Sequence, residues 1–240
     1  MSSASQSRTA LYGADTRFTH TPIRGDQLVL EQFLLLFRLR LLFAASVLLV
    51  MVMGWPHPPL WLQWTALLLV VVTAINTLRH KHMFLGLVLI LGFTNMALLG
   101  LEQLVELPAN LTNGIGLFVF YVAMVASLFH RVTHERPVTG ELIYGLLAFY
   151  LLLALAFAMA YQMVNSLVVD AFWSSHGDLQ LDDFVYYSLV TLTTVGYGDI
   201  HALAPAARLL AGAEAVAGVM FIAIAVARSL MLINDRGTDV

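Results

Sequence analysis

The chain contains no cysteine, which excludes a disulfide framework and any metal site built from thiolates. Charged residues are also scarce, at 11% of the 240 residues, whereas hydrophobic residues make up 60%. Soluble domains carry about 25% charged residues, so this composition excludes an ordinary soluble domain and predicts a protein of the lipid bilayer. The net charge of -3 says little about partners, because the distribution of the charges matters more than their sum. No nucleic-acid partner is expected.

Residues 1–25 are polar and rich in serine and threonine. Because they contain no apolar run that could form a core, we expect them to be a disordered cytosolic tail. They also lack the charged start, apolar stretch and small-residue cleavage site of a signal peptide. The tail is therefore expected to remain in the mature protein.

Six apolar segments follow the tail. Their lengths fit a hydrocarbon core of about 30 Å that a helix crosses at about 1.5 Å per residue. An interfacial helix over residues 28–37 precedes the first span, and a proline-rich loop should end that span. The predicted spans cover residues 39–55, 60–78, 83–104, 114–130, 142–164 and 205–233.

The basic residues set the orientation of these spans. With a cytosolic N-terminus, all lysines and arginines except Arg208 lie on the inner side, as the positive-inside rule requires. Both termini are then cytosolic, and the outer mouth between the last two spans is acidic, which suits a cation path. Only residues 234–240 follow the sixth span, so no cytosolic ligand-binding domain is expected.

A glycine-containing loop, Thr193–Asp199 with the sequence TTVGYGD, lies between the fifth and sixth spans. Gly196 and Gly198 can adopt backbone angles that other residues avoid, so successive carbonyls can turn toward one axis. Irregular backbone at membrane depth persists only where it lines a cavity or is buried in protein. A single copy would leave these carbonyls unsatisfied, so we expect several subunits around a common axis. An ordinary turn between helices is the alternative, and the long apolar flanks argue against it.

This loop resembles the signature of the tetrameric potassium channels, in which four TVGYG loops line a narrow pore with backbone carbonyls. The resemblance is specific across residues 142–232 and rests only on segment count and topology before them. It implies an all-α membrane protein of six transmembrane helices, with a re-entrant pore helix and a filter loop between the last two. The implied domains are the tail (1–25), a four-helix scaffold like a voltage sensor (26–136) and a pore domain (137–240).

The resemblance also assigns roles around the loop. It implies that K⁺ binds at the filter residues Thr194, Val195, Gly196 and Tyr197, with Gly198 closing the outer end. Residues expected to support the filter are Thr193, Tyr186, Tyr187, Asp199 and Glu214. Tyr187 is expected to approach Asp199, with a plain packing role as the alternative. Where some members of the family place a glutamate beside the filter aspartate, this chain has Val190.

Two aspartates open the predicted pore helix. Either Asp182 or Asp183 is expected as its N-cap, because a carboxylate there accepts backbone N–H groups and complements the positive helix end. Alternatively, both are outer-mouth charges that concentrate cations. His201, two residues after the filter aspartate, is also expected at the outer mouth.

The sixth span carries one acidic residue, Glu214, which as an intramembrane ionisable group is a functional candidate. At about 100° per residue it is turned roughly 140° from Val219, so it should face the pore helix and bond a hydroxyl or a backbone amide. Gly218 matches the family's hinge, although close helix packing is an equal alternative, as it is for Gly212. The residues expected to line the pore are Val219, Ile222, Val226 and Leu230.

These features predict a homotetrameric potassium channel of a bacterial inner membrane, which conducts K⁺ passively. It is not expected to be an enzyme or to need a cofactor beyond the permeant K⁺. Residues 114–129 contain no arginine or lysine, so the fourth helix is not expected to sense voltage. A regulatory or non-conducting subunit of a heteromeric channel is the alternative. A transporter with four such loops in one chain fails because only one loop is present.

Overall fold

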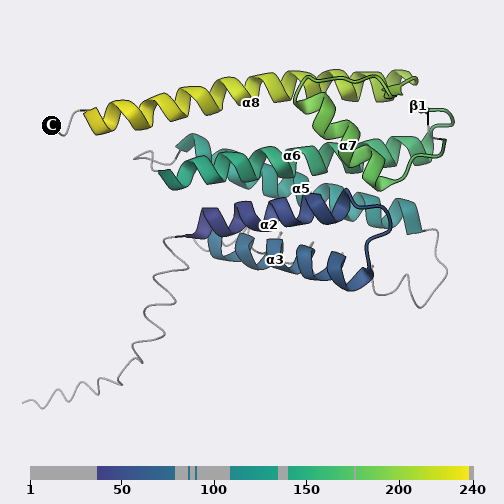
Figure 1. The fold of residues 1–240 in the computed structure, drawn as a ribbon. Coiled ribbons are helices and arrows are strands. Elements are labelled where there is room, and N and C mark those ends of the chain that lie inside the picture. Colours follow the sequence, from purple (N-terminus) through teal and green to yellow (C-terminus); the bar gives the residue numbers. More distant parts are fainter. Residues whose placement is uncertain are drawn as a thin grey trace, which may run out of the picture.

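The computed structural model describes residues 37–78, 86, 90, 109–134, 140–175 and 177–237. These residues form a layered arrangement of long helices with one short, tilted helix between two of them (Figure 1). The elements, in chain order, are α2 (Arg38–Met53), α3 (Leu60–Leu78), α5 (Ala109–His134), α6 (Gly140–Leu167), β1 (Phe172–Ser174), α7 (Leu181–Leu192), β2 (Ile200–Ala202) and α8 (Pro205–Gly237).

Helix α6 is the centre of the fold. Its sequence is dominated by leucine and alanine, which are strong helix formers and make the helix apolar on all sides, as a buried helix requires. It contacts α2 and α5 on one side and α7 and α8 on the other. Buried side chains such as Leu152, Leu155 and Met159 join these contacts into one hydrophobic core.

The scaffold helices pack on the α6 of their own chain. Helix α2 lies against both α3 and α6, and α5 runs along α6. Near the start of α2, the Arg40 guanidinium pairs with Glu141, close to the start of α6, and lies 5.0 Å from the centre of the Tyr144 ring. An ion pair and a cation–π contact therefore tie the first described helix to the first turns of α6.

The observed helices agree with the predicted spans within the described residues. Helix α3 has the predicted bounds, α2 begins and ends within two residues of its prediction, and the fourth to sixth predicted spans lie inside α5, α6 and α8. Two helical stretches are long and apolar enough to cross a membrane, Glu141–Leu167 and Pro205–Leu230. Shorter apolar helices cover Leu60–Asn76 and Gly114–His130. The N-terminal tail, the interfacial helix and nearly all of the third span lie outside the described residues.

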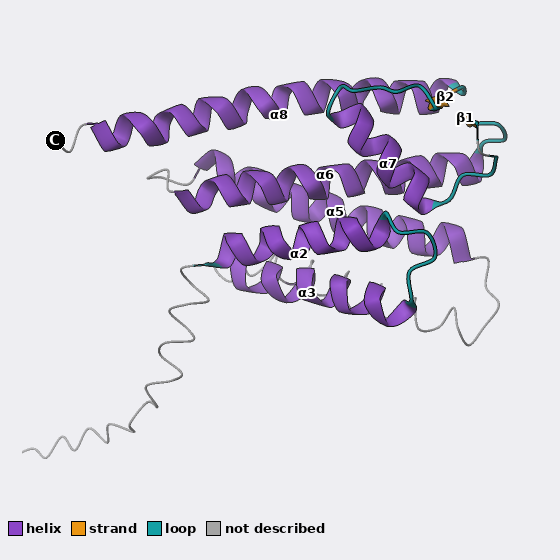
Figure 2. Ribbon diagram, viewed as in Figure 1, coloured by secondary structure: helices purple, strands orange, loops and turns teal. Residues whose placement is uncertain are grey.

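A two-stranded sheet interrupts the otherwise helical fold and was not expected from the sequence (Figure 2). Strands β1 and β2 are antiparallel, with Phe172 opposite Ala202 and Trp173 opposite His201. The sheet joins the segment after α6 to the segment that precedes α8. The sheet therefore holds in place both ends of the inserted segment, which contains α7 and the loop that follows it.

Candidate functional site

Helix α7 begins at Leu181, one residue before the first of the two aspartates that were predicted to cap it. Its N-cap is Gln180, whose backbone N–H donates to Asp183 Oδ2 at 2.8 Å. The prediction that Asp182 or Asp183 is the N-cap is therefore wrong. A side chain three residues into a helix can reach back to the N-cap amide, and this reach moves the cap to Gln180. Asp183 still satisfies a backbone donor at the helix start, as the prediction required of a carboxylate.

The loop after α7 has alternating backbone geometry. Thr194, Gly196 and Gly198 have φ values of 61°, 56° and 82°, whereas the intervening Val195 and Tyr197 are not in the positive-φ region. Positive φ is uncommon for a residue such as threonine, and such conformations gather at functional sites. Alternation of this kind turns successive carbonyls to the same side of the chain.

The loop's hydrogen bonds leave those carbonyls available. The backbone N–H groups of Val195 and Gly196 both donate to the Val190 carbonyl, at 3.0 and 3.3 Å. Within the described part of the chain, the carbonyls of residues 194–197 accept no hydrogen bond. The loop is exposed along its length, and Tyr197 keeps 72% of its surface. It is a row of acceptors without partners among the described residues, and it joins the end of α7 to β2 (Figure 2).

Thr193 connects the loop to the helix before it. It is the C-cap of α7, and its hydroxyl donates to the Leu189 carbonyl at 2.6 Å. Its side chain therefore satisfies a carbonyl of the last helical turn and does not reach into the row of loop carbonyls.

Tyr186 holds the outer end of the loop. Its hydroxyl donates to Asp199 Oδ2 at 2.8 Å, and its ring lies parallel to that of Tyr197 with centroids 6.5 Å apart. The prediction that Tyr187 approaches Asp199 is therefore wrong. Adjacent helix positions differ by about 100°, so only one of the two tyrosines can face the loop.

Tyr187 packs inside the protein, which is the alternative that the sequence left open. It is buried, and its ring meets those of Tyr161 and Phe172 edge to face, at 4.9 and 5.7 Å between centroids. This aromatic cluster joins α7 to α6 and to β1. Such edge-to-face pairs stabilise a core beyond the area that they bury.

Glu214 lies fully buried behind the loop. One carboxylate oxygen accepts a hydrogen bond from the Tyr161 hydroxyl and the other accepts one from the Ser188 hydroxyl. The prediction that Glu214 faces the pore helix and bonds a hydroxyl is confirmed. Because a buried carboxylate needs donors to replace water, this pair of bonds fixes α6, α7 and α8 relative to one another.

Gly218 lies where α8 crosses the end of α7. A Cβ added there would be 2.2 Å from the Leu192 carbonyl oxygen, which also accepts the Tyr150 hydroxyl at 3.0 Å. Helix α8 continues without interruption past this point. Of the two interpretations of Gly218, a hinge and close helix packing, the structure supports close packing. At Gly212 no atom of the described residues lies within 4 Å of an added Cβ.

The residues predicted to line a pore share an uncovered strip of α8. Val219, Ile222, Val226 and Leu230 each keep between 48% and 60% of their surface exposed. They recur at spacings of three and four, so they form one apolar face. That face is free to meet other copies of the chain or an open path between them.

His201 lies beside the outer end of the loop. Its Nδ1 is 3.4 Å from the Gly198 carbonyl oxygen, and its ring lies 4.8 Å from that of Trp173 across the sheet. Trp173 could not be predicted from the sequence, because the sheet that pairs it with His201 was not expected. Tyr150 and Tyr161 were not predicted either, although the sequence holds a signal, since residues eleven apart lie on one face of a helix.

Comparison with protein families supports an ion channel for this region. Residues 146–234 match a family model described as "Ion channel", and the match covers most of α6, all of α7 and most of α8. That family is one of channels and not of enzymes, so the expectation that the chain is not an enzyme is confirmed. Searches of curated proteins and of solved structures found no match. The chain is therefore a membrane protein with an ion channel domain, and passive ion conduction is the activity that this domain supports.

Proposed function

We propose that the chain is one subunit of a homotetrameric, potassium-selective channel. Four copies place their Thr193–Asp199 loops around one axis, with the α7 helices behind them and the exposed strips of α8 below. The α7 helices point their C-terminal ends toward the axis, where the negative end of the helix dipole favours a cation. Ions then move down their electrochemical gradient without any chemical change, and no cofactor takes part.

The row of unpartnered carbonyls carries this proposal. Thr194, Gly196 and Gly198 have positive φ and alternate with residues that do not, and the N–H groups of Val195 and Gly196 are bonded back to the Val190 carbonyl. Four such rows supply the oxygen ligands that replace the hydration shell of K⁺. The ions bind at Thr194, Val195, Gly196 and Tyr197, and Gly198 ends the row. The Tyr186–Asp199 hydrogen bond and the buried Glu214 keep each row in position.

The helices before α6 form a scaffold in this proposal. Helix α5 is the fourth span, and its residues 114–129 contain no arginine or lysine that could move in the membrane field. The excess of basic residues on one side favours cytosolic termini. In this proposal the chain lies in the inner membrane of a bacterial cell. The scaffold packs on the α6 of its own chain, so each subunit carries its own support.

Ion flux into vesicles containing only the purified chain tests the proposal. Vesicles loaded for a flux assay should take up potassium and exclude sodium. The matched control is Gly196→Ala, in which a Cβ is added at φ 56°, where it strains the backbone and disturbs the carbonyl row. The variant should still assemble but lose potassium flux. Normal potassium selectivity in the variant would contradict the filter assignment. A wild-type tetramer that conducts no ions would favour a regulatory subunit.

A further inference from the structure

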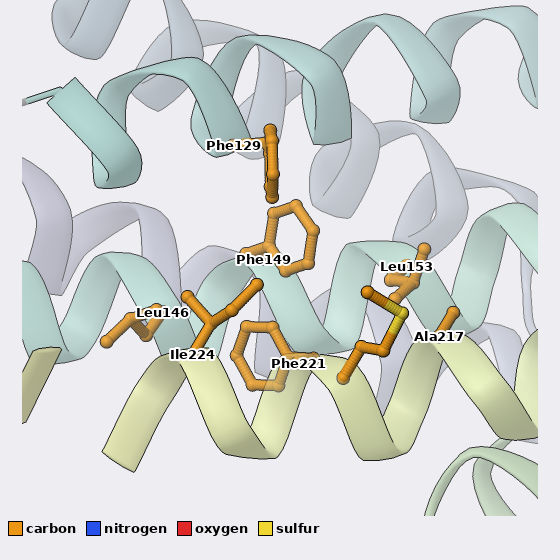
Figure 3. A pocket seen from close by; sticks show the side chains of 8 residues that line it. Phe129, Leu146, Phe149, Leu153, Ala217, Phe221 and Ile224 are labelled. Atoms are coloured by element: carbon orange, nitrogen blue, oxygen red, sulfur yellow. The ribbon is translucent and has the colours of Figure 1, made fainter. Parts of the chain in front are cut away.

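A cavity lies between the scaffold and the last described helix, α8. It has a volume of about 220 Å³ and lies between α5, α6 and α8. Figure 3 shows Phe129 reaching down toward Phe149, and Phe221 beyond Phe149, with Leu153 and Ala217 along the other side. Phe129 belongs to α5, and the other lining residues belong to α6 and α8, the two helices that are long and apolar enough to cross a membrane.

The cavity is suited to an apolar occupant. All eight residues that line it have apolar side chains. A polar ligand would lose its hydrogen bonds to water there and gain none, which costs several kcal/mol per group in hydrocarbon surroundings. Engineered cavities of about 150 Å³ with a similar lining stay free of water and bind benzene. The present cavity is larger, so it can hold a longer hydrocarbon segment.

The cavity opens toward the bilayer and not toward the proposed pore. Phe129 and Met220, which border it, keep 47% and 60% of their surfaces exposed. On α8, Phe221 and Ile224 each follow a pore-lining residue by two positions, which turns them about 200° from the pore face. Copies that meet at the pore face therefore leave the cavity facing the membrane.

Aromatic contacts connect the cavity to the filter. Phe129 lies 6.1 Å from Phe149, which stacks on Phe221 at 5.1 Å with the ring planes 9° apart. Phe221 is in turn 5.0 Å from the ring of Tyr150. The Tyr150 hydroxyl donates to the carbonyl of Leu192, the last residue of α7. An occupant of the cavity thus touches rings that reach the end of the pore helix.

We propose that this cavity binds one acyl chain of a bilayer phospholipid. The bilayer surrounds the opening and supplies saturated and unsaturated hydrocarbon at high concentration, which fits a site without polar groups. The bound chain separates Phe129 and Met220 and keeps Phe149 against Phe221. The position of the opening toward the bilayer and any effect of the bound chain on ion flux both rest on the proposed tetrameric channel.

Photolabelling tests the binding directly. The full chain is reconstituted in phosphatidylcholine vesicles that contain a small fraction of phosphatidylcholine with a diazirine in one acyl chain. After illumination, peptides that carry label are mapped. Ala217→Trp fills the cavity from α8, and it should lower labelling of residues 146–153 and 217–224 by about tenfold, equivalent to about 1.4 kcal/mol. The matched control is Leu147→Trp, which adds the same side chain on an exposed face of α6 outside the cavity.

Each outcome decides for or against the site. Strong labelling of the two segments in the wild type and in Leu147→Trp, with loss in Ala217→Trp, supports it. Equal labelling in all three proteins overturns it, because the label then reports only general contact with lipid. If Ala217→Trp does not assemble, Ala217→Leu takes its place and should lower labelling in part. Potassium flux measured on the same vesicles separates the binding claim from the channel claim, since labelling is read whether or not ions pass.

Discussion

Helices α6 and α8 are both long and apolar, yet the rest of the described chain buries much more of α6 than of α8. In the most apolar 18-residue window of α6, 61% of the residues are buried within the chain, whereas in that of α8 only 11% are buried. Helix α6 has neighbours on both sides, and α8 contacts α6, α7 and β2. A largely apolar helix with few neighbours among the described residues leaves a face available to other subunits, lipid or a pore.

The uncovered face of α8 also has a different character from its covered face. The covered face holds Glu214 and Gly218, which are fixed to the pore helix by hydrogen bonds and by close backbone contact. The opposite face holds the apolar residues Val219, Ile222, Val226 and Leu230, which keep 48% to 60% of their surface. Helix α8 is therefore anchored on one side and largely exposed on the other.

The largest expected effect comes from the glycine on the anchored face. Gly218→Ala places a Cβ 2.2 Å from a backbone oxygen, and no rotamer change can relieve that contact. The variant should lose at least about 3 kcal/mol of stability, the upper part of the usual range for overpacking, together with its ion flux. Thermal unfolding of the solubilised protein and vesicle flux measure both effects.

Gly212→Ala is the matched control on the same helix. No atom of the described residues lies within 4 Å of its added Cβ, so it should gain up to about 1 kcal/mol from helix propensity. Equal losses in both variants would show that the contact with Leu192 is not what makes Gly218 necessary.

The second expected effect concerns the buried carboxylate. Tyr161→Phe removes one of the two hydroxyls that donate to Glu214 and leaves a buried oxygen without that donor. We expect a loss of about 1–3 kcal/mol in the free energy of unfolding. Tyr144→Phe, on the same helix but outside this cluster, should change stability much less. If the two variants unfold alike, Glu214 does not depend on its hydroxyl partners.

A smaller effect is expected at the outer mouth. His201→Lys places up to four positive charges near the Gly198 carbonyls, and these charges oppose the entry of cations. This variant should have a lower inward conductance than the wild type, whereas the uncharged His201→Gln should have a higher conductance than His201→Lys. Current recorded in planar bilayers with symmetric potassium measures the difference. Equal inward conductance in His201→Lys and His201→Gln would mean that charge at this position does not act on ion entry.

The smallest effect is expected from voltage. Residues 114–129 of α5 carry no basic side chain, so moving this helix transfers little charge across the field. Open probability in symmetric potassium should therefore change with voltage by less than the equivalent of about one gating charge, or about 2.3 kcal/mol per 100 mV. A steep curve equivalent to several charges would mean that the scaffold is a sensor after all.

Much of this fold could be predicted because its signals are local. The lengths of the apolar segments predicted α3 and α6, and the helical position of Glu214 relative to Val219 predicted that it faces α7. Predictions that depended on one residue of offset were less secure. The sequence could not separate Tyr186 from Tyr187 as the partner of Asp199, since both are aromatic and adjacent, and only the orientation of α7 decides between them. It also could not choose Gln180 over the aspartates as the N-cap, because these residues lie within three positions of one another and all can accept a backbone hydrogen bond.

Long-range pairing was the other limit. The pairing of β1 with β2 joins segments whose short length carries no alternating pattern, so the contact of Trp173 with His201 could not be foreseen. The role of Gly218 also required the structure. A hinge and a close approach both need a residue without a side chain, and only the position of the Leu192 carbonyl distinguishes them.

The most direct test of the central claim is the reversal potential of the purified wild-type chain in a planar bilayer, with potassium on one side and sodium on the other. If four Thr193–Asp199 loops form a potassium filter, current should reverse only at a voltage strongly displaced in the direction that opposes potassium flow. A reversal potential near zero, with measurable current, would contradict the account because it would show a pore that does not distinguish the two ions.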